Sequence, residues 1–122
     1  MTLDELFGQV TQKVRAQVQT AAPDRLYALA GKASRTEEAV RVAMSAYSVG
    51  VAQATGQPVS APDDFDTDGD LASTALALFG LAEAAIAGIP DPATRLKLNP
   101  VFCELAGALE QVMQLADEIS VS

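Results

Sequence analysis

The 122-residue sequence contains no histidine, and this absence excludes several kinds of active site. Without histidine there is no Ser-His-Asp or Cys-His catalytic group, no histidine-ligated haem or zinc, and no Glu-x-x-His di-iron site. A glycine-rich phosphate-binding loop is also missing. We therefore expect a non-enzymatic protein with no catalytic residue and no resident cofactor.

Cysteine and aromatic residues are scarce. The single cysteine, Cys103, cannot form an internal disulfide, which is compatible with a reducing cytoplasm. The first residues, MTLDELFGQV, lack the basic region and apolar run of a signal peptide, so we expect a cytoplasmic protein. With four Phe, two Tyr and no Trp, the core of a single domain over residues 1–122 must be mainly aliphatic.

Positive charge is also in short supply. The net charge is −8, and residues 1–56 hold six basic and five acidic side chains, whereas residues 57–122 hold two basic and eleven acidic ones. Such a surface repels nucleic-acid phosphates and anionic membranes, so we expect neither as a partner. A basic protein partner suits it better.

The apolar residues that are present recur at helical spacing. Helix-capping signals at Thr2–Glu5 and Ser34–Glu37 and terminators at Gly31, Gly56 and Pro90 separate the periodic stretches. We predict an all-α four-helix bundle with long helices at about 3–20, 35–55, 70–88 and 100–119. One or two short connecting helices are expected at 24–30 and 92–98, and the long connection after residue 56 permits a crossover.

The stretch 71–88, LASTALALFGLAEAAIAG, carries one charge, Glu83. Its length approaches that of a membrane span, but aspartates flank it and basic anchors are missing. We therefore predict a buried helix at the packing centre of the bundle. It has an arc of bulky side chains and a ridge of small ones, Gly80, Ala84 and Gly88, against which another helix can pack closely.

The last predicted helix has a seam that resembles a coiled coil. Its apolar residues repeat at three- and four-residue spacing from Phe102 to Ile119. A chain of this size has difficulty hiding so much apolar surface, so we predict a protein–protein interaction or structural module that self-associates. The predicted interface residues are Leu105, Leu109, Val112, Gly80, Ala84 and Gly88.

The segment before the 71–88 helix is acidic. Residues 64–71, DFDTDGDL, resemble the first eight positions of an EF-hand calcium loop, with Asp64, Asp66 and Asp68 as side-chain ligands. The resemblance fails at its ninth and twelfth positions, which are Ala72 and Ala75, so any calcium site is weak. Two other interpretations are that the last aspartates cap the following helix, and that the loop docks a basic partner. The docking residues would be Asp63, Asp64, Asp66, Asp68 and Asp70.

Overall fold

The computed structural model describes residues 2–61, 65 and 69–120. It consists of four helices, α1 (Leu3–Val18), α2 (Pro23–Thr55), α3 (Leu71–Ala87) and α4 (Pro92–Ser120). These described residues form no strand, only an isolated bridge between Thr2 and Ser60. The predicted all-α four-helix bundle is confirmed.

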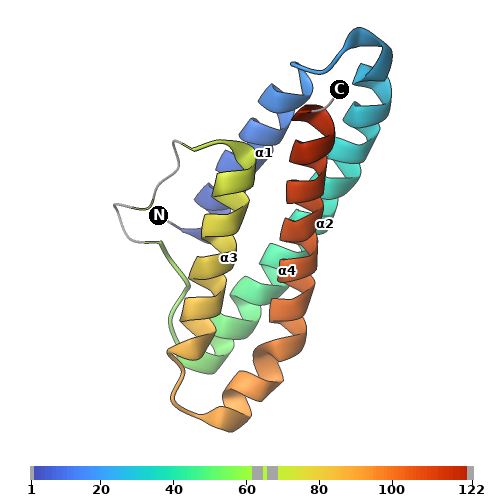
Figure 1. Ribbon diagram of the computed structural model, residues 1–122. Helices are drawn as coiled ribbons and strands as arrows, with labels where there is room; N and C mark the ends of the chain where they lie inside the picture. The colour runs from blue at the N-terminus through green and yellow to red at the C-terminus, as the bar shows by residue number, and fades with distance from the viewer. Residues whose placement is uncertain (1, 62–64, 66–68, 121–122) are drawn as a thin grey trace.

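Most contacting pairs of the four helices are antiparallel. Figure 1 shows α1 and α4 running in one direction, and α2 and α3 running in the other. Short connections join α1 to α2 and α3 to α4, whereas the segment between α2 and α3 returns the chain to the opposite end of the bundle. This connection is the crossover that its length permits.

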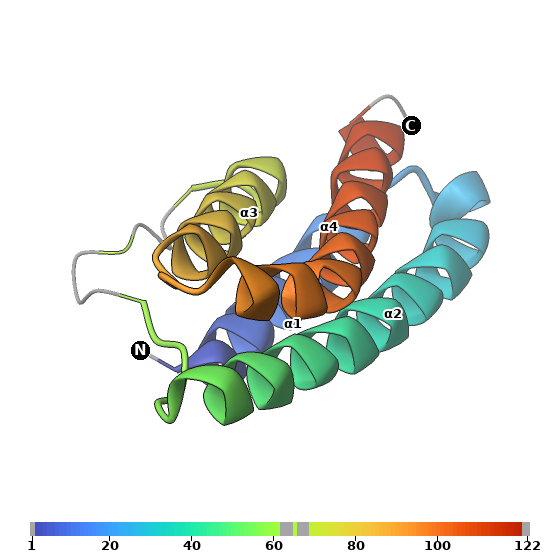
Figure 2. The ribbon, with the colours of Figure 1, turned by 90° about the horizontal axis from the view of Figure 1, so that it is seen from below.

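The central helix is α4, not α3. α4 packs extensively against α2 and α3 and also contacts α1, while α3 has few contacts with α2. Seen from below, α4 lies between α3 and α2 (Figure 2). The predicted place of the 71–88 helix at the packing centre is therefore wrong. Much of its apolar character comes from Ala and Gly, which bury little area each, whereas α4 buries a continuous row of larger side chains.

The ends of α1 and α3 follow their local sequence. Thr2 caps α1, because its side-chain oxygen accepts a hydrogen bond from the Glu5 N–H at 3.2 Å. Asp70 caps α3 in the same way, accepting from the Ser73 N–H at 2.8 Å. Each cap satisfies a backbone donor that the first helical turn leaves without a partner.

The predicted short helix at 24–30 and the long helix at 35–55 are one helix, α2. A single buried stripe, which includes Leu29, Ala33 and Val40, runs through the expected break at Gly31. Glu37, expected to complete a capping box, instead pairs with Arg15 of α1, 3.3 Å from Nε to Oε1. Packing of this stripe overrides the local stop and start signals.

The predicted short helix at 92–98 is likewise part of α4, which contains Pro100 in its interior. Proline removes one helical hydrogen bond and favours a bend, and the first turns of α4 run obliquely to the rest (Figure 1). Leu98, on those first turns, is buried over Gly50 of α2, where an added Cβ would lie 3.3 Å from Leu98 Cδ2. This close contact holds the first turns of α4 against α2.

Tyr47 lies at the centre of the core, where α2, α3 and α4 meet. Its side chain is fully buried, and its hydroxyl donates a 2.8 Å hydrogen bond to the carbonyl oxygen of Ala82 on α3. Burial raises the pKa of Tyr47 to about 12, because the phenolate form is poorly solvated there. This hydrogen bond links two helices that otherwise have few contacts.

Candidate functional site

The outward side of α3 is an apolar helical surface, which we call the α3 face. Its only charged side chain is that of Glu83, and Leu76 is 61% exposed. A Cβ built on Gly80 would have no neighbour within 4 Å, so this part of the helix is open and flat. The residues of the α3 face are Ser73, Leu76, Gly80, Glu83, Ala84, Ala87 and Gly88.

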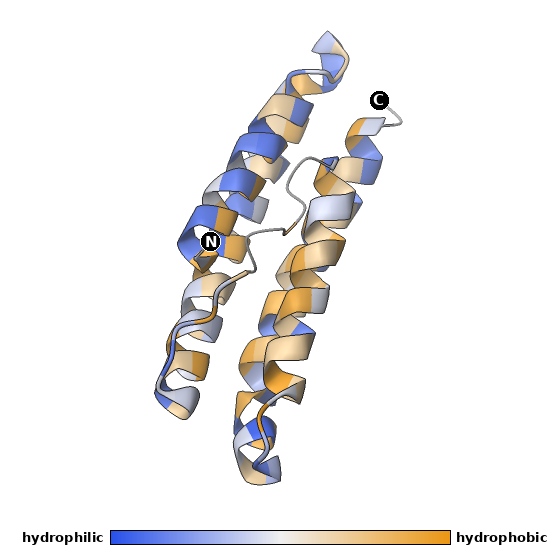
Figure 3. Cartoon of the chain, turned by 90° about the vertical axis from the view of Figure 1, so that its left-hand side faces the viewer, coloured by the Kyte–Doolittle hydropathy of each residue, from blue (hydrophilic) through white to orange (hydrophobic). Residues whose placement is uncertain are grey.

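The outward sides of the neighbouring long helices are different in character. Exposed residues of α2 include Lys32, Arg35, Glu38 and Arg41, and exposed residues of α4 include Lys97, Glu104, Glu110 and Asp117. Figure 3 shows α3 as a largely orange, hydrophobic ribbon beside the blue stretches of α1. The outward sides of α2 and α4 also expose single apolar residues, such as Val42, Val49 and Leu96, but among several charged ones. A helix side that faces water is usually polar, so the α3 face is unusual in carrying a single charge.

The structure divides the predicted interface into two groups. Gly80, Ala84 and Gly88 are exposed on the α3 face and are available to a partner. The other three residues, Leu105, Leu109 and Val112, are 3%, 0% and 0% exposed. They pack within the chain's own core, because α4 is the central helix, and they offer no surface to a second copy.

A groove of about 550 Å³ adjoins the α3 face at the end of the bundle. Ala84 and Gly88 belong to both, so the groove and the α3 face form one continuous surface. Its far wall includes Asp91, which caps α4 by accepting a 3.2 Å hydrogen bond from the Ala93 N–H and also accepts a 2.7 Å hydrogen bond from the Thr94 hydroxyl. The remaining lining residues are Ala54, Thr55, Ala85, Ile89, Pro90 and Thr94.

Of the acidic segment, the structure describes residues 65, 69 and 70. Hydrogen bonds from Ser73 hold the pKa of the Asp70 carboxyl below its usual value, as expected for a helix cap. Lys13 of α1 donates to the Gly69 carbonyl at 2.5 Å and to the Thr74 hydroxyl at 2.8 Å, which fixes the start of α3 on α1. The predicted docking and calcium residues Asp63, Asp64, Asp66 and Asp68 lie outside the described residues.

The described residues contain neither a cluster of metal ligands nor a membrane-spanning helix. Over 2–61, 65 and 69–120, no three His, Cys, Asp or Glu side chains are grouped so as to hold a metal ion. Within the same residues, no helix has the length and apolar character needed to cross a membrane.

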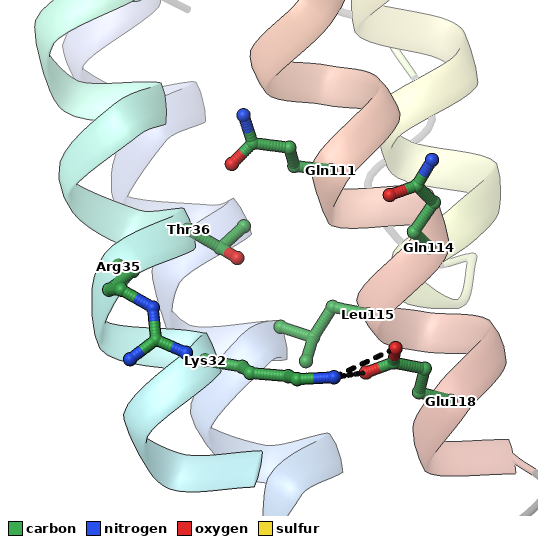
Figure 4. Close-up of a pocket in the computed structure, with 7 residues that line it drawn as sticks. All are labelled: Lys32, Arg35, Thr36, Gln111, Gln114, Leu115 and Glu118. Atoms are coloured by element: carbon green, nitrogen blue, oxygen red, sulfur yellow. Dashed lines mark hydrogen bonds and ion pairs between the residues drawn. The ribbon is translucent and has the colours of Figure 1, made fainter. Parts of the chain in front are cut away.

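A second surface feature, missed from the sequence, is a polar cleft of about 220 Å³ between α2 and α4. Thr36 and Leu115 project toward each other from the two helices and form its buried floor (Figure 4). Lys32 and Glu118 close one edge with an ion pair of 2.9 Å. Arg35, Gln111 and Gln114 complete the lining. In the sequence, the lining appears as polar residues at three- and four-residue spacing on both helices. This spacing is also typical of an ordinary solvated helix surface, so it does not indicate a cleft.

No protein-family model matches this chain, and neither curated proteins nor solved structures give a match.

Proposed function

We propose that this protein is a cytoplasmic, non-enzymatic helical interaction module that binds a second copy of itself through the α3 face. The observation that carries this proposal is an exposed helix side with one charge, Glu83, among small and apolar residues. Contiguous apolar surface on a soluble protein marks a site of association. A symmetric dimer covers such a surface with the same surface of its partner.

The α3 face is self-complementary in an antiparallel pairing about a two-fold axis at Gly80. At this point the helix carries no side chain, so the two backbones approach at the short end of the usual interaxial distance, about 8 Å. Leu76, 61% exposed, is the one large apolar side chain of the surface. In the pairing it inserts into a hole formed by the partner's Gly80, Ala84 and Ala87, in the manner of a coiled-coil knob.

Sedimentation equilibrium at micromolar concentration tests the proposal. The expected mass is twice the 12.7 kDa of the chain. Gly80→Glu should give a monomer, because it places two carboxylates and their bulk at the two-fold axis. Gly107→Glu is the matched control: Gly107 is also exposed and helical, with nothing within 4 Å of an added Cβ, but it lies on α4. A wild-type monomer, or equal effects of the two substitutions, would contradict the proposal.

Leu76→Ala provides a second test. The side chain is exposed in the monomer, so its truncation should leave the monomer's fold unchanged while weakening association. Removing a buried apolar anchor from an interface costs more than about 1 kcal/mol when that anchor fills a pocket. An unchanged dissociation constant would exclude the inserted Leu76.

Docking to a basic protein through Asp63, Asp64, Asp66, Asp68 and Asp70 is a second candidate, supported by the negative charge concentrated in residues 57–122. Salt distinguishes self-association through the α3 face from docking of a basic protein, because high ionic strength screens charge pairing but not apolar contact. Association through the α3 face should persist in 0.5 M salt, whereas acidic docking should weaken markedly, by about an order of magnitude or more.

Weak calcium binding by Asp64, Asp66 and Asp68 stays a prediction. A rise in melting temperature with millimolar calcium would support it.

A further inference from the structure

The α2–α4 cleft contains two cationic side chains, Lys32 and Arg35, in a protein of net charge −8. Lys32 already has a partner, since its ammonium lies 2.9 Å from both carboxylate oxygens of Glu118. The guanidinium of Arg35 differs: across residues 2–61, 65 and 69–120, no hydrogen bond or ion pair engages it. The cleft therefore has one cation with unused hydrogen-bonding capacity.

Apart from Lys32, Arg35 and Glu118, the side chains that line the cleft are uncharged. The side-chain amide of Gln111 extends from α4 towards α2, whereas Gln114 lies on the side of α4 away from α2 (Figure 4). The hydroxyl of Thr36 is on the side of Leu115, and the Arg35 guanidinium lies along α2, with Nη1 3.7 Å from a Cβ built on Gly31. Thr36 and Leu115 are 6% and 3% exposed, so the floor is largely shielded from water. Shielding strengthens a charged hydrogen bond made above such a floor.

We propose that this cleft binds a small oxyanion, a free carboxylate or phosphate group, with Arg35 as its principal ligand. A guanidinium presents a fork of N–H donors that matches two oxygens of such a group. Lys32 is the second cation, and Thr36 and Gln111 supply neutral donors. The volume of about 220 Å³ equals that of roughly seven liquid water molecules, which suits a ligand of a few heavy atoms.

Glu118 limits the affinity of this site. It is the one acidic side chain lining the cleft, and it neutralises Lys32 through their ion pair. Removing its charge both frees Lys32 and removes repulsion of the ligand. The proposal therefore predicts opposite effects for substitutions at two positions of the same cleft, Arg35 and Glu118.

The probes are inorganic phosphate and succinate, each titrated into ¹⁵N-labelled protein at constant ionic strength maintained with chloride. Saturable shifts of the Thr36 and Leu115 amide signals are expected with at least one probe, and the stronger probe identifies the ligand class. Arg35→Gln should weaken binding about tenfold or more, the usual range for a lost charged hydrogen bond. Glu118→Gln should strengthen it about two- to fivefold, the range of an exposed charge interaction.

Two matched controls separate a built site from general charge. Arg25→Gln removes an exposed arginine from the same helix, and Glu110→Gln removes an exposed carboxylate from α4, in each case outside the cleft. Both should retain wild-type affinity, and circular dichroism checks that every variant is folded. Shifts that rise without saturation, an Arg35→Gln variant that binds like wild type, or an equal loss in Arg25→Gln would overturn the proposal.

Discussion

Replacing Tyr47 by Phe removes one oxygen atom from the centre of the core. That oxygen donates to the Ala82 carbonyl at 2.8 Å, and the side chain is fully buried. Ala82 lies inside α3, so its carbonyl keeps its helical partner after the substitution. The loss at neutral pH is therefore that of a single hydrogen bond, about 1 kcal/mol of unfolding free energy. The melting temperature should fall by about 3–6 °C for a chain of this length.

The same hydroxyl makes the stability of the wild type sensitive to alkaline pH. Burial raises the pKa of Tyr47 to about 12, whereas the unfolded chain has a tyrosine pKa of about 10. The neutral form is favoured by folding, so its contribution is complete below pH 10 and is lost as the pH rises from 10 towards 12. At pH 11 the loss is about 1.4 kcal/mol. This loss exceeds the contribution of the hydrogen bond removed in Tyr47→Phe, so the two proteins should be equally stable just below pH 11, and Tyr47→Phe should be the more stable protein above that pH.

Urea unfolding at fixed protein concentration between pH 7 and 11.5 measures both effects. Subtracting the unfolding free energy of Tyr47→Phe from that of the wild type at each pH removes the contributions of the other groups that titrate in this range. Tyr27→Phe is the control, since Tyr27 is 93% exposed and its hydroxyl should contribute little at any pH. If the difference in unfolding free energy between wild type and Tyr47→Phe stayed constant up to pH 11.5, the raised pKa of a buried Tyr47 would be refuted.

Three further substitutions test the helix ends and interiors. Gly31→Ala should raise the unfolding free energy by about 0.5–1 kcal/mol, because Gly31 lies inside α2 and an added methyl would meet only the Arg35 guanidinium, at 3.7 Å. Gly56→Ala should instead destabilise the protein, because Gly56 ends α2 at φ +75°, where a side chain is strained. Thermal melting of both variants measures these effects. A Gly31→Ala variant less stable than the wild type would contradict a continuous α2. Asp70→Ala should lower the melting temperature at pH 7 by removing the α3 cap. Because hydrogen bonds from Ser73 lower the pKa of Asp70, the stabilisation is present above the ordinary aspartate pKa and is lost as the pH falls through the lowered value. Melting curves of the two proteins should therefore approach each other in acid, and a gap that stays constant would argue against this carboxylate as the cap.

The features predicted correctly from the sequence are those determined by neighbouring residues. Thr2 caps α1 as the local pattern indicates, and Asp70 caps α3, one of the interpretations left open for the acidic segment. The same local rules failed at Gly31 and Pro100, which look like helix boundaries but lie inside α2 and α4. Packing of apolar side chains on both sides of each position outweighs a local preference of about 1 kcal/mol for glycine.

Features that depend on which helices become neighbours were not predictable from periodicity. An apolar pattern indicates that a helix is buried, but it does not identify the helix that covers it. The exposure of Gly80 and the burial of Leu109 both follow from the central place of α4. The α2–α4 cleft likewise joins Arg35 to Gln111, residues far apart in the chain, and neither is distinctive in its own segment.

The alternating direction of the helices also determines where charge selectivity can arise. Every helix carries partial positive charge at its first turn and partial negative charge at its last. Because α4 runs opposite to α2 and α3, the first turn of α4 lies beside the last turns of α2 and α3 at one end of the bundle. The opposed partial charges offset one another in part at that end. The α2–α4 cleft lies along the flank, so its proposed preference for an anion rests on the side chains of Arg35 and Lys32.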